Sequence, residues 1–216
     1  NFITCINNQG LSHFIVNGRI LKSINQFYNK DKAVLMSFIG NKGSSKRIEK
    51  LTFKRNNKIN DFFHKTSRKV IDYCVEHNIK NIVIGYNKDW KQDINLGKSN
   101  NQNIVCIPFL KLIRQIQYKA EEVGVNVILT EESYPSKIDH LALEKMEHKT
   151  KYLGKRIKRG MFVSSTGKFL NADVNGALGI LRKVIDDASF KKDLIDRGTV
   201  FVPFKVNNLN KSFIKV

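Results

Sequence analysis

Short apolar runs and longer periodic stretches divide this chain into predicted strands and helices. Two apolar runs, at residues 2–6 and 14–16, are each followed by a turn that contains asparagine and glycine, which predicts a pair of strands. Apolar residues at three- and four-residue steps predict a helix over residues 24–38 and a much longer one over residues 45–78. The first third of the chain is therefore expected to form two strands followed by two helices.

The rest of the chain continues to alternate between strand and helix patterns. An apolar run at residues 82–84 predicts a buried strand, and a periodic stretch at residues 108–124 predicts a helix with proline at its first position. Residues 125–129 are predicted as a strand, and Asn171 as the N-cap of an apolar helix that extends to residue 185. This alternation indicates an α/β fold with some parallel pairing, which we treat as one domain over residues 1–216.

The charge balance narrows the choice of partner. The chain has 38 Lys and Arg against 19 Asp and Glu, a formal net charge of +19. Such an excess favours a polyanion such as nucleic acid, because each phosphate that is neutralised releases counterions. A general bias towards lysine, asparagine and isoleucine is the alternative explanation. A hydrophobic fraction of 41% with 14 Phe excludes a disordered basic tail.

Cysteine usage and hydropathy exclude other classes of protein. The three cysteines, Cys5, Cys74 and Cys106, are widely spaced and form no C-x-x-C motif, so no disulfide framework is predicted. No apolar run approaches the roughly 18 residues that a membrane-spanning helix needs, and no signal peptide is present. We expect an intracellular protein without a membrane partner. Because Asn1 leads directly into an apolar run, we also expect the chain to be a fragment of a longer protein.

Basic residues are concentrated on the long predicted helix, where Arg55 and Lys58 are two of many cations. The pattern has two explanations: a solvated helix face, or a basic surface that binds along a nucleic-acid backbone. Trp90 next to Lys91 has two explanations as well: it stacks on a base or sugar, or it packs half-buried against the protein. We carry all four residues forward as candidate nucleic-acid contacts.

Two acidic elements stand out in this basic chain. Glu131 and Glu132 directly follow the strand at residues 125–129, and Asp173 lies in the first turn of the helix that follows Asn171. Metal-assisted cleavage of a phosphodiester needs several carboxylates around its ions, and hard oxygen ligands suit Mg²⁺ or Mn²⁺. Only one of the two glutamates is expected to face such a site, because side chains alternate along a strand. We find no convincing third carboxylate.

Both acidic elements also have ordinary structural explanations. The helix dipole favours an aspartate in the first turn of any helix. A pair of glutamates after a strand is often part of a solvated loop. The residues alone therefore leave a catalytic and a structural interpretation open.

A series of short strings resembles one family of transposon-encoded proteins. In chain order these strings are residues 16–19 (VNGR), 21–26 (LKSINQ), 27–30 (FYNK), 85–87 (GYN), 90–91 (WK), 101–102 (NQ), 107–109 (IPF), 131–137 (EESYPSK), 154–160 (GKRIKRG) and 171–177 (NADVNGA). They resemble the TnpB (OrfB) family over nearly the whole chain and in the same order.

This resemblance implies a RuvC-like nuclease domain of the RNase H-like fold, in which helices flank a mixed sheet, with the helix at residues 45–78 as an insertion. Members of the family are RNA-guided DNA endonucleases that use three acidic residues and Mg²⁺. The resemblance therefore implies guide RNA and target DNA as partners, with Mg²⁺ or Mn²⁺ as the cofactor. It also implies a prokaryotic cytoplasmic protein that joins the nucleoid when it is bound to DNA.

The resemblance assigns roles to the acidic residues of this chain. Asp173 matches the aspartate of the third nuclease motif. Many members carry the middle glutamate at the position that is Gly85 here, whereas a rearranged branch has it in the Glu-Glu-Ser-Tyr string. Glu132 is our first choice for the middle acid and Glu131 the second, so that Glu132 and Asp173 are the expected metal ligands.

Two departures from the family pattern matter. The first nuclease motif, which carries an aspartate, is expected a few residues before Asn1, so the fragment alone should be inactive or nearly so. Many relatives also have a four-cysteine zinc ribbon between their second and third motifs, but residues 136–170 contain no cysteine, and two histidines are too few for a tetrahedral site. We expect no zinc and a basic loop in place of the ribbon. Four cations of this loop are candidate phosphate contacts, with a solvated loop as the alternative: Lys155, Arg156, Lys158 and Arg159.

The expected function is metal-dependent hydrolysis of DNA by the longer protein to which this chain belongs. Two alternatives remain from other classes: a guide-directed DNA-binding protein that does not cleave, and a basic RNA-binding module without catalysis. The oligomeric state cannot be predicted from these residues.

Overall fold

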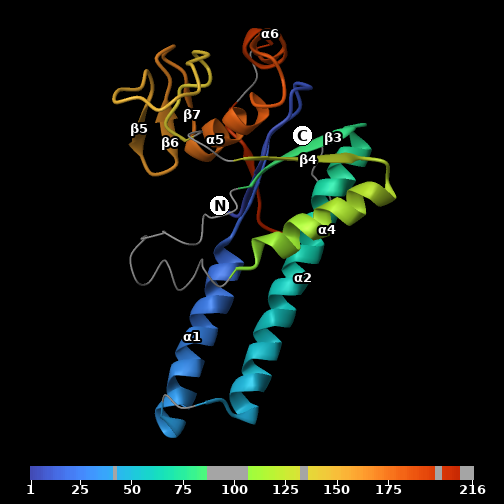
Figure 1. The fold of residues 1–216 in the computed structure, drawn as a ribbon, viewed down its shortest axis with the longest axis vertical. Helices are drawn as coiled ribbons and strands as arrows, with labels where there is room; N and C mark the ends of the chain where they lie inside the picture. The colour runs from blue at the N-terminus through green and yellow to red at the C-terminus, as the bar shows by residue number, and fades with distance from the viewer. Residues whose placement is uncertain (41–42, 87–106, 132–135, 198–200, 210–216) are drawn as a thin grey trace. The chain divides into compact units, whose positions relative to one another are not determined.

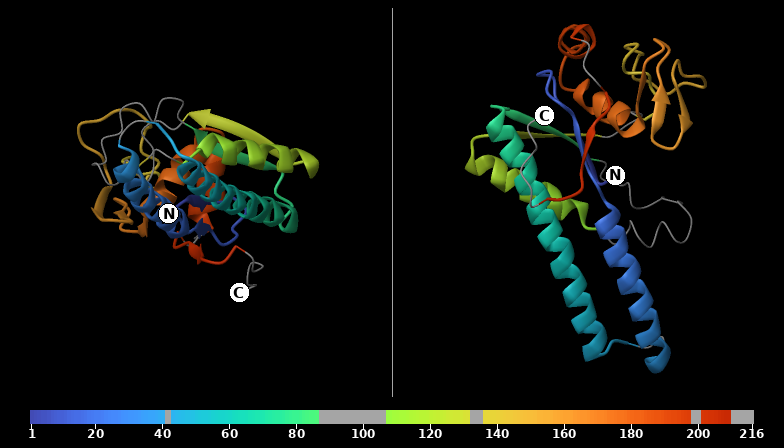
Figure 2. Two further views of the ribbon diagram at one scale, coloured as in Figure 1. Left: turned by 90° about the horizontal axis from the view of Figure 1, so that it is seen from below. Right: turned by 180° about the vertical axis from the view of Figure 1, so that it is seen from behind.

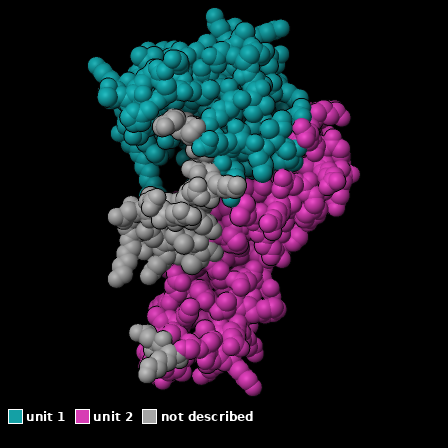
Figure 3. Space-filling view, viewed as in Figure 1, with its two compact units in different colours: residues 1–17, 81–88, 127–207 teal, residues 18–80, 89–126, 208–216 magenta. Residues whose placement is uncertain are grey.

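The computed structural model describes residues 1–40, 43–86, 107–131, 136–197 and 201–209. They form helices and small sheets, which confirms the α/β class expected from the sequence (Figure 1). Within these ranges no helix is both long enough and apolar enough to cross a membrane. The chain divides into two compact units, coloured separately in Figure 3, and we describe each by itself.

The described residues of the second unit form three helices: α1 (Arg19–Ile39), α2 (Lys46–Glu76) and α4 (Phe109–Glu122). The 31-residue α2 is the long helix expected over residues 45–78. It runs antiparallel to α1 and packs against both α1 and α4 (Figures 1 and 2). Apolar residues of the predicted stripe, such as Ile59, Phe62 and Val70, are buried, as the periodicity predicted.

The ends of these helices follow local sequence signals. Ser45 caps α2, and its side chain accepts a hydrogen bond from the Ile48 amide over 3.4 Å. Pro108 is the N-cap of α4, one residue before the helix, although the sequence placed it at the first helical position. Gly124 has a positive φ of 69° just after α4, a conformation that favours glycine, and therefore ends the helix as expected.

Buried polar side chains connect the helices of the second unit. Lys119 of α4 is only 4% exposed, and its ammonium donates to the Ser67 hydroxyl over 2.7 Å and to the His64 carbonyl over 2.8 Å. Burial lowers the pKa of Lys119, because the charged ammonium is less well solvated than in water. The two hydrogen bonds hold α4 against α2 at a fixed register.

In the first unit, the described strands form three small sheets. The first sheet has the order β1–β2–β8, from Ile3–Cys5, Phe14–Val16 and Phe204–Val206, with β1 antiparallel and β8 parallel to β2. The second pairs β3 (Asn81–Tyr86) with β4 (Asn126–Glu131). The strands predicted from the apolar runs are therefore present. They form separate small sheets in the described part of the chain, whereas a single mixed sheet was expected.

The third sheet corrects the prediction for residues 136–170. Instead of one basic loop, the end of this segment forms β5 (Lys155–Lys158), β6 (Met161–Val163) and β7 (Phe169–Asn171) as an antiparallel sheet of order β5–β6–β7. Only one residue of β6 and one of β7 are fully buried, Phe162 and Leu170. Such short strands, with so few inward-facing apolar residues, show too weak an alternation to be predicted from the sequence.

Helix α5 (Ala172–Leu181) follows β7 directly and organises the first unit. It packs against β1, β3, β6 and β7. Val174 and Leu178 of α5 are fully buried in a cluster that also contains Phe162 and Leu170 of the third sheet. The segment after α5 contributes further buried residues to this cluster. It includes α6 (Asp187–Phe190) and the π-helical turn η1 (Lys191–Asp196).

Candidate functional site

Asp173 lies in the first turn of α5, where the sequence placed it. The side chain of Asn171 caps the helix and accepts hydrogen bonds from the amides of Asp173, over 2.8 Å, and Val174, over 3.4 Å. Because Asn171 takes over the capping role, the Asp173 carboxylate is not needed for it and is exposed to solvent. The carboxylate is therefore accessible to a ligand from solvent.

The start of the chain lies beside Asp173. The side-chain amide of Asn1, two residues before β1, donates a hydrogen bond to the Asp173 carboxylate. Helix α5 also packs against β1. Residues at the N-terminal end of β1 are therefore close to Asp173, although 172 positions separate Asn1 from Asp173 in the sequence.

Glu131 is the last residue of β4, and its side chain is exposed. Its main-chain carbonyl accepts a hydrogen bond from the Lys183 ammonium, just beyond the C-terminus of α5. Asp173 lies at the other end of this ten-residue helix, which is about 15 Å long. The Glu131 carbonyl is thus bound by a residue that follows the C-terminal end of α5, whereas the Asp173 carboxylate lies at the N-terminal end.

Glu132, our first choice for the middle acid, lies outside the described residues. In the part of the chain that is described, no three side chains of His, Cys, Asp or Glu gather in a group that could hold a metal ion. Asp173 supplies one hard oxygen donor of the kind that Mg²⁺ prefers, but one carboxylate is too few for a metal centre. The fit of these residues to a metal site is therefore partial.

Gly85 of β3 is the residue that the family resemblance matched to the middle glutamate of many TnpB proteins. A Cβ atom at this position would lie 2.4 Å from Cδ1 and 2.9 Å from Cγ1 of Ile180 in α5. A glycine at residue 85 thus allows α5 to pack closely against β3. A glutamate at this position would clash with Ile180 in the observed packing.

We therefore expect Gly85→Glu to destabilise the first unit by about 1–3 kcal/mol, the usual effect of overpacking. Thermal unfolding followed by circular dichroism would measure the change. Gly176→Ala in α5 is the matched control, because a Cβ there meets no atom within 4 Å. Since alanine is the better helix former, this control should be neutral or stabilising by up to about 1 kcal/mol. A Gly85→Glu protein as stable as the wild type would contradict the packing argument.

The four candidate cations of the third sheet are all exposed. Lys155, Arg156 and Lys158 belong to β5, and Arg159 begins the two-residue turn to β6. The two glycines of the GKRIKRG string have structural roles. A Cβ at Gly154 would lie 2.5 Å from the Phe162 ring, and Gly160 has a φ of 81° in the turn. The glycines shape the sheet, and the cations between them remain free for phosphate contacts.

A network of buried carboxylates precedes this sheet and was not found from the sequence. Asp139 is fully buried and accepts hydrogen bonds from the Ser164 hydroxyl over 2.9 Å, from both the amide (2.6 Å) and the hydroxyl (2.9 Å) of Ser165, and from the Ala142 amide over 3.3 Å. Glu144 is also buried, and accepts from the amides of Asp139 (2.8 Å) and Leu153 (3.2 Å). These two acids hold the segment against the third sheet.

Arg182 connects the same segment to the end of α5. It is buried, donates to both carboxylate oxygens of Asp187 over 2.8 and 2.9 Å, and donates to the Glu144 carbonyl over 3.0 Å. The hydrogen bonds from Arg182 lower the pKa of Asp187 below its usual range. His140 lies 3.2 Å from the same guanidinium through Nδ1. The sequence contains no spacing signal for this network, because its members come from distant positions.

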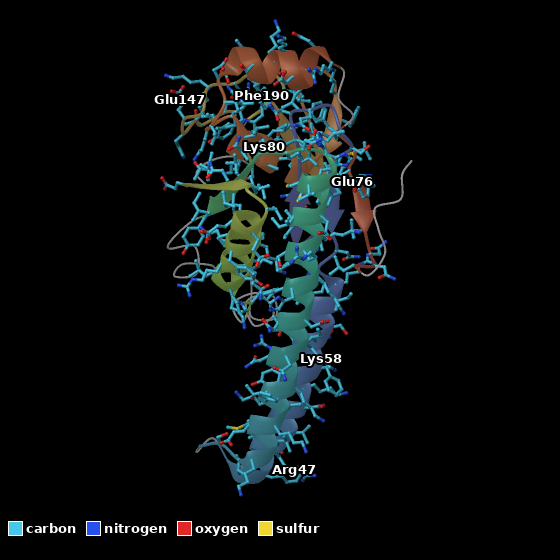
Figure 4. All side chains as sticks on the ribbon, turned by 90° about the vertical axis from the view of Figure 1, so that its right-hand side faces the viewer. Arg47, Lys58, Glu76, Lys80, Glu147 and Phe190 are labelled. Carbon is cyan, nitrogen blue, oxygen red and sulfur yellow. The ribbon has the colours of Figure 1, made fainter. Side chains whose placement is uncertain are left out.

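The candidate cations on α2 differ in their surroundings. Arg55 is half-buried and donates from Nε (2.9 Å) and Nη2 (2.7 Å) to the side-chain oxygen of Asn25 in α1, so it joins the two helices. Lys58 is exposed and lies on α2 between the labelled ends of the helix (Figure 4). Trp90 and Lys91 lie outside the described residues. Lys58 therefore keeps its candidate role, while Arg55 also has a structural one.

Two family models match this chain. Residues 1–91 match a family described as a probable transposase of the OrfB_IS605 type. Residues 109–180 match the TNB domain of Cas12f1-like proteins. Together the two matches extend from β1 to α5 and include Asp173. They confirm the family expected from the short sequence strings.

A solved structure has a similar fold. It is a cryo-EM structure of a Cas12f1–sgRNA–target DNA complex, with a TM-score of 0.59 and 15% sequence identity. The alignment covers 82% of this chain but only 45% of the Cas12f1 chain, so this chain spans less than half the length of that relative. At this identity the match concerns the fold alone. No curated protein matches the chain.

Proposed function

Because the chain belongs to the TnpB/OrfB family, we propose that it is the RuvC-like, RNase H-like nuclease portion of a longer RNA-guided DNA endonuclease. Guide RNA and target DNA are the partners in this proposal. The similar Cas12f1 structure contains an sgRNA and a target DNA, and the net charge of +19 suits both polyanions.

The observation that carries the proposal is the position of the Asp173 carboxylate. It is exposed, and it lies beside the N-terminal end of β1. It does not cap α5, because the Asn171 side chain does so. An acid delivered by a residue just ahead of β1 would therefore come close to Asp173. Such convergence of carboxylates from separate elements is what metal-assisted hydrolysis of a phosphodiester requires.

In this proposal Asp173 and one of the two adjacent glutamates hold Mg²⁺ or Mn²⁺. When bound, the ion would activate water and stabilise charge on the leaving oxygen. The protein residues have separate tasks: Asn171 orients the first turn of α5 and thereby Asp173, and Lys155, Lys158 and Arg159 would contact phosphates along the DNA.

The direct test is cleavage of plasmid DNA that carries a guide-matched target. The full-length protein that contains these residues is assembled with the RNA from its own element and incubated with or without Mg²⁺. We expect Mg²⁺-dependent, guide-dependent cutting. Guide-dependent binding without cutting, under any divalent ion, would instead favour the DNA-binding alternative.

The two neighbouring glutamates can be separated in the same assay. We expect Glu132→Gln to lower the cleavage rate about 100-fold or more, because several kcal/mol of transition-state stabilisation depend on the metal site. Glu131→Gln is the matched control and should change the rate less than about fivefold. If Glu131→Gln lowers the rate and Glu132→Gln does not, Glu131 is the metal ligand. If neither substitution lowers the rate, the middle acid lies elsewhere.

A further inference from the structure

Asn175 is a buried polar residue in the first half of α5. Its side chain is fully buried, and its amide nitrogen donates a hydrogen bond to the Ile138 carbonyl over 2.8 Å. The oxygen of the same amide has no hydrogen-bond partner among the described residues. Asparagine is also a weaker helix former than alanine. Because burial of an unpaired oxygen costs free energy, the stability of α5 alone does not explain an asparagine at this position.

The helix turn that contains Asn175 also contains Asp173. Two positions along an α-helix correspond to a rotation of about 200° around its axis, so the two side chains point to opposite sides. The Asp173 carboxylate is exposed on one side, whereas the Asn175 amide is buried on the other. The hydrogen bond from Asn175 therefore holds the Ile138 carbonyl at a fixed position relative to Asp173, although 37 positions separate Asn175 from Ile138 in the sequence.

The segment that Asn175 binds begins at the acidic pair. Ile138 follows Glu131, the first of the two glutamates, by seven positions. The Glu131 carbonyl accepts a hydrogen bond from Lys183, which follows the C-terminal end of α5. The backbone is thus attached at both ends of this segment: at Glu131 by Lys183, and at Ile138 by the helix turn that contains Asp173.

We propose that Asn175 is a positioning residue for the metal site, an inference that rests on the proposed nuclease function. Through the Ile138 carbonyl, Asn175 fixes the segment that supplies the middle acid to the helix turn that supplies Asp173. It acts through the backbone and not by contact with the ion. Residues that hold metal ligands in place typically change metal affinity or activity by about 10- to 100-fold.

The attachment can be tested without metal or activity. Hydrogen exchange is followed by mass spectrometry in the full-length protein that contains these residues. The amides of Asp139 and Ala142, just after Ile138, are hydrogen-bonded to the side chains of Glu144 and Asp139. We expect Asn175→Ala to speed exchange in peptides that contain these two amides by roughly fivefold or more, because the backbone before them loses its attachment. Peptides from α2 should exchange as in the wild type.

The positioning role is tested by the Mg²⁺ dependence of guided cleavage. We expect Asn175→Ala to raise the Mg²⁺ concentration that gives half of the maximal rate about tenfold, and to leave the rate at saturating Mg²⁺ within about threefold of the wild type. A displaced ligand weakens binding of the ion, and an excess of the ion restores its occupancy. Lys183→Met removes the other attachment from a partly exposed side chain, and should shift the Mg²⁺ dependence in the same direction.

Asp187→Ala is the matched control for a loss of stability in the same unit. Asp187 is exposed and pairs with Arg182, at the C-terminal end of α5. Its removal should lower the melting temperature but leave the Mg²⁺ dependence unchanged, because neither Ile138 nor Glu131 loses its hydrogen bond. Thermal unfolding of each variant sets an assay temperature at which all of them are folded.

Three outcomes would overturn the inference. Unchanged exchange in Asn175→Ala would show that the segment is not held by this residue. Faster exchange with an unchanged Mg²⁺ dependence would leave Asn175 with a structural role alone. An equal Mg²⁺ shift in Asp187→Ala would show that any loss of stability weakens the site. Failure of the nuclease proposal looks different: Asp173→Asn would then cut as fast as the wild type, or the wild type would not cut, while hydrogen exchange would still respond to Asn175→Ala.

Discussion

Replacing Asp173 with asparagine should lower the rate of guided DNA cleavage about 100-fold or more. The substitution keeps the size of the side chain, and its oxygen can still accept the hydrogen bond from Asn1. The negative charge that a Mg²⁺ ion requires is lost, and with it several kcal/mol of transition-state stabilisation. The measurement is the rate of plasmid cutting under single-turnover conditions with saturating guide and Mg²⁺.

The fold should tolerate this change. Asp173 is exposed and Asn171 caps α5, so only the favourable interaction of the charge with the helix dipole is lost, which is at most about 1 kcal/mol. Asp196→Asn, at an exposed aspartate of the same unit, is the matched control and should cleave normally. If Asp173→Asn cuts as fast as the wild type, Asp173 is not a metal ligand. Loss of DNA binding together with cleavage would point to misfolding or to a role in binding.

The second large effect is expected at Asp139. Asp139→Ala removes the buried acceptor of four hydrogen bonds, one of which comes from the buried Ser164 hydroxyl. Because hydrogen bonds to a charged group contribute about 1.5–3 kcal/mol each, we expect the first unit to lose about 3 kcal/mol or more. For a unit of about 100 residues this lowers the melting temperature by roughly 10–25 °C. Thermal unfolding by circular dichroism or calorimetry would measure it.

Metal removal distinguishes this network from a zinc ribbon. If Asp139 and Glu144 hold the segment before the third sheet, EDTA should leave the melting temperature of the wild type unchanged, whereas loss of a structural zinc would lower it. Asp196→Ala is the control for removal of an aspartate from the same unit, and should shift the melting temperature by less than about 2 °C. A chelator-sensitive wild type, or an Asp139→Ala protein of normal stability, would contradict this account.

Elements with a strong local signal were predictable. The apolar period of α2, with Ser45 at its start, and the stop of α4 at Gly124 are encoded within a few residues of each site. The same holds for Asn171 as a cap and Asp173 as an exposed acid in the first turn of α5. Local signals suffice here because helix periodicity and capping involve neighbours three or four positions apart.

The third sheet and its supports were not predictable in the same way. β5 has four exposed residues, three of them cations, and β6 and β7 have three residues each. Nothing near Asp139 in the sequence indicates that its partners are serines 25 and 26 positions later. Such strands are stabilised by contacts with distant residues, and those contacts are absent from any local pattern.

The sequence by itself determined the family, the α/β class, the long basic helix and the two acidic elements, because motifs, periodicity and charge are properties of the linear chain. Only the tertiary structure decided that Asn1 lies beside Asp173, that Ile180 fills the space a side chain at residue 85 would need, and that the Asn175 side chain binds the Ile138 carbonyl. Each of these depends on packing between segments far apart in the chain. A residue becomes a ligand, a spacer or a positioning residue only through the neighbours that folding brings to it.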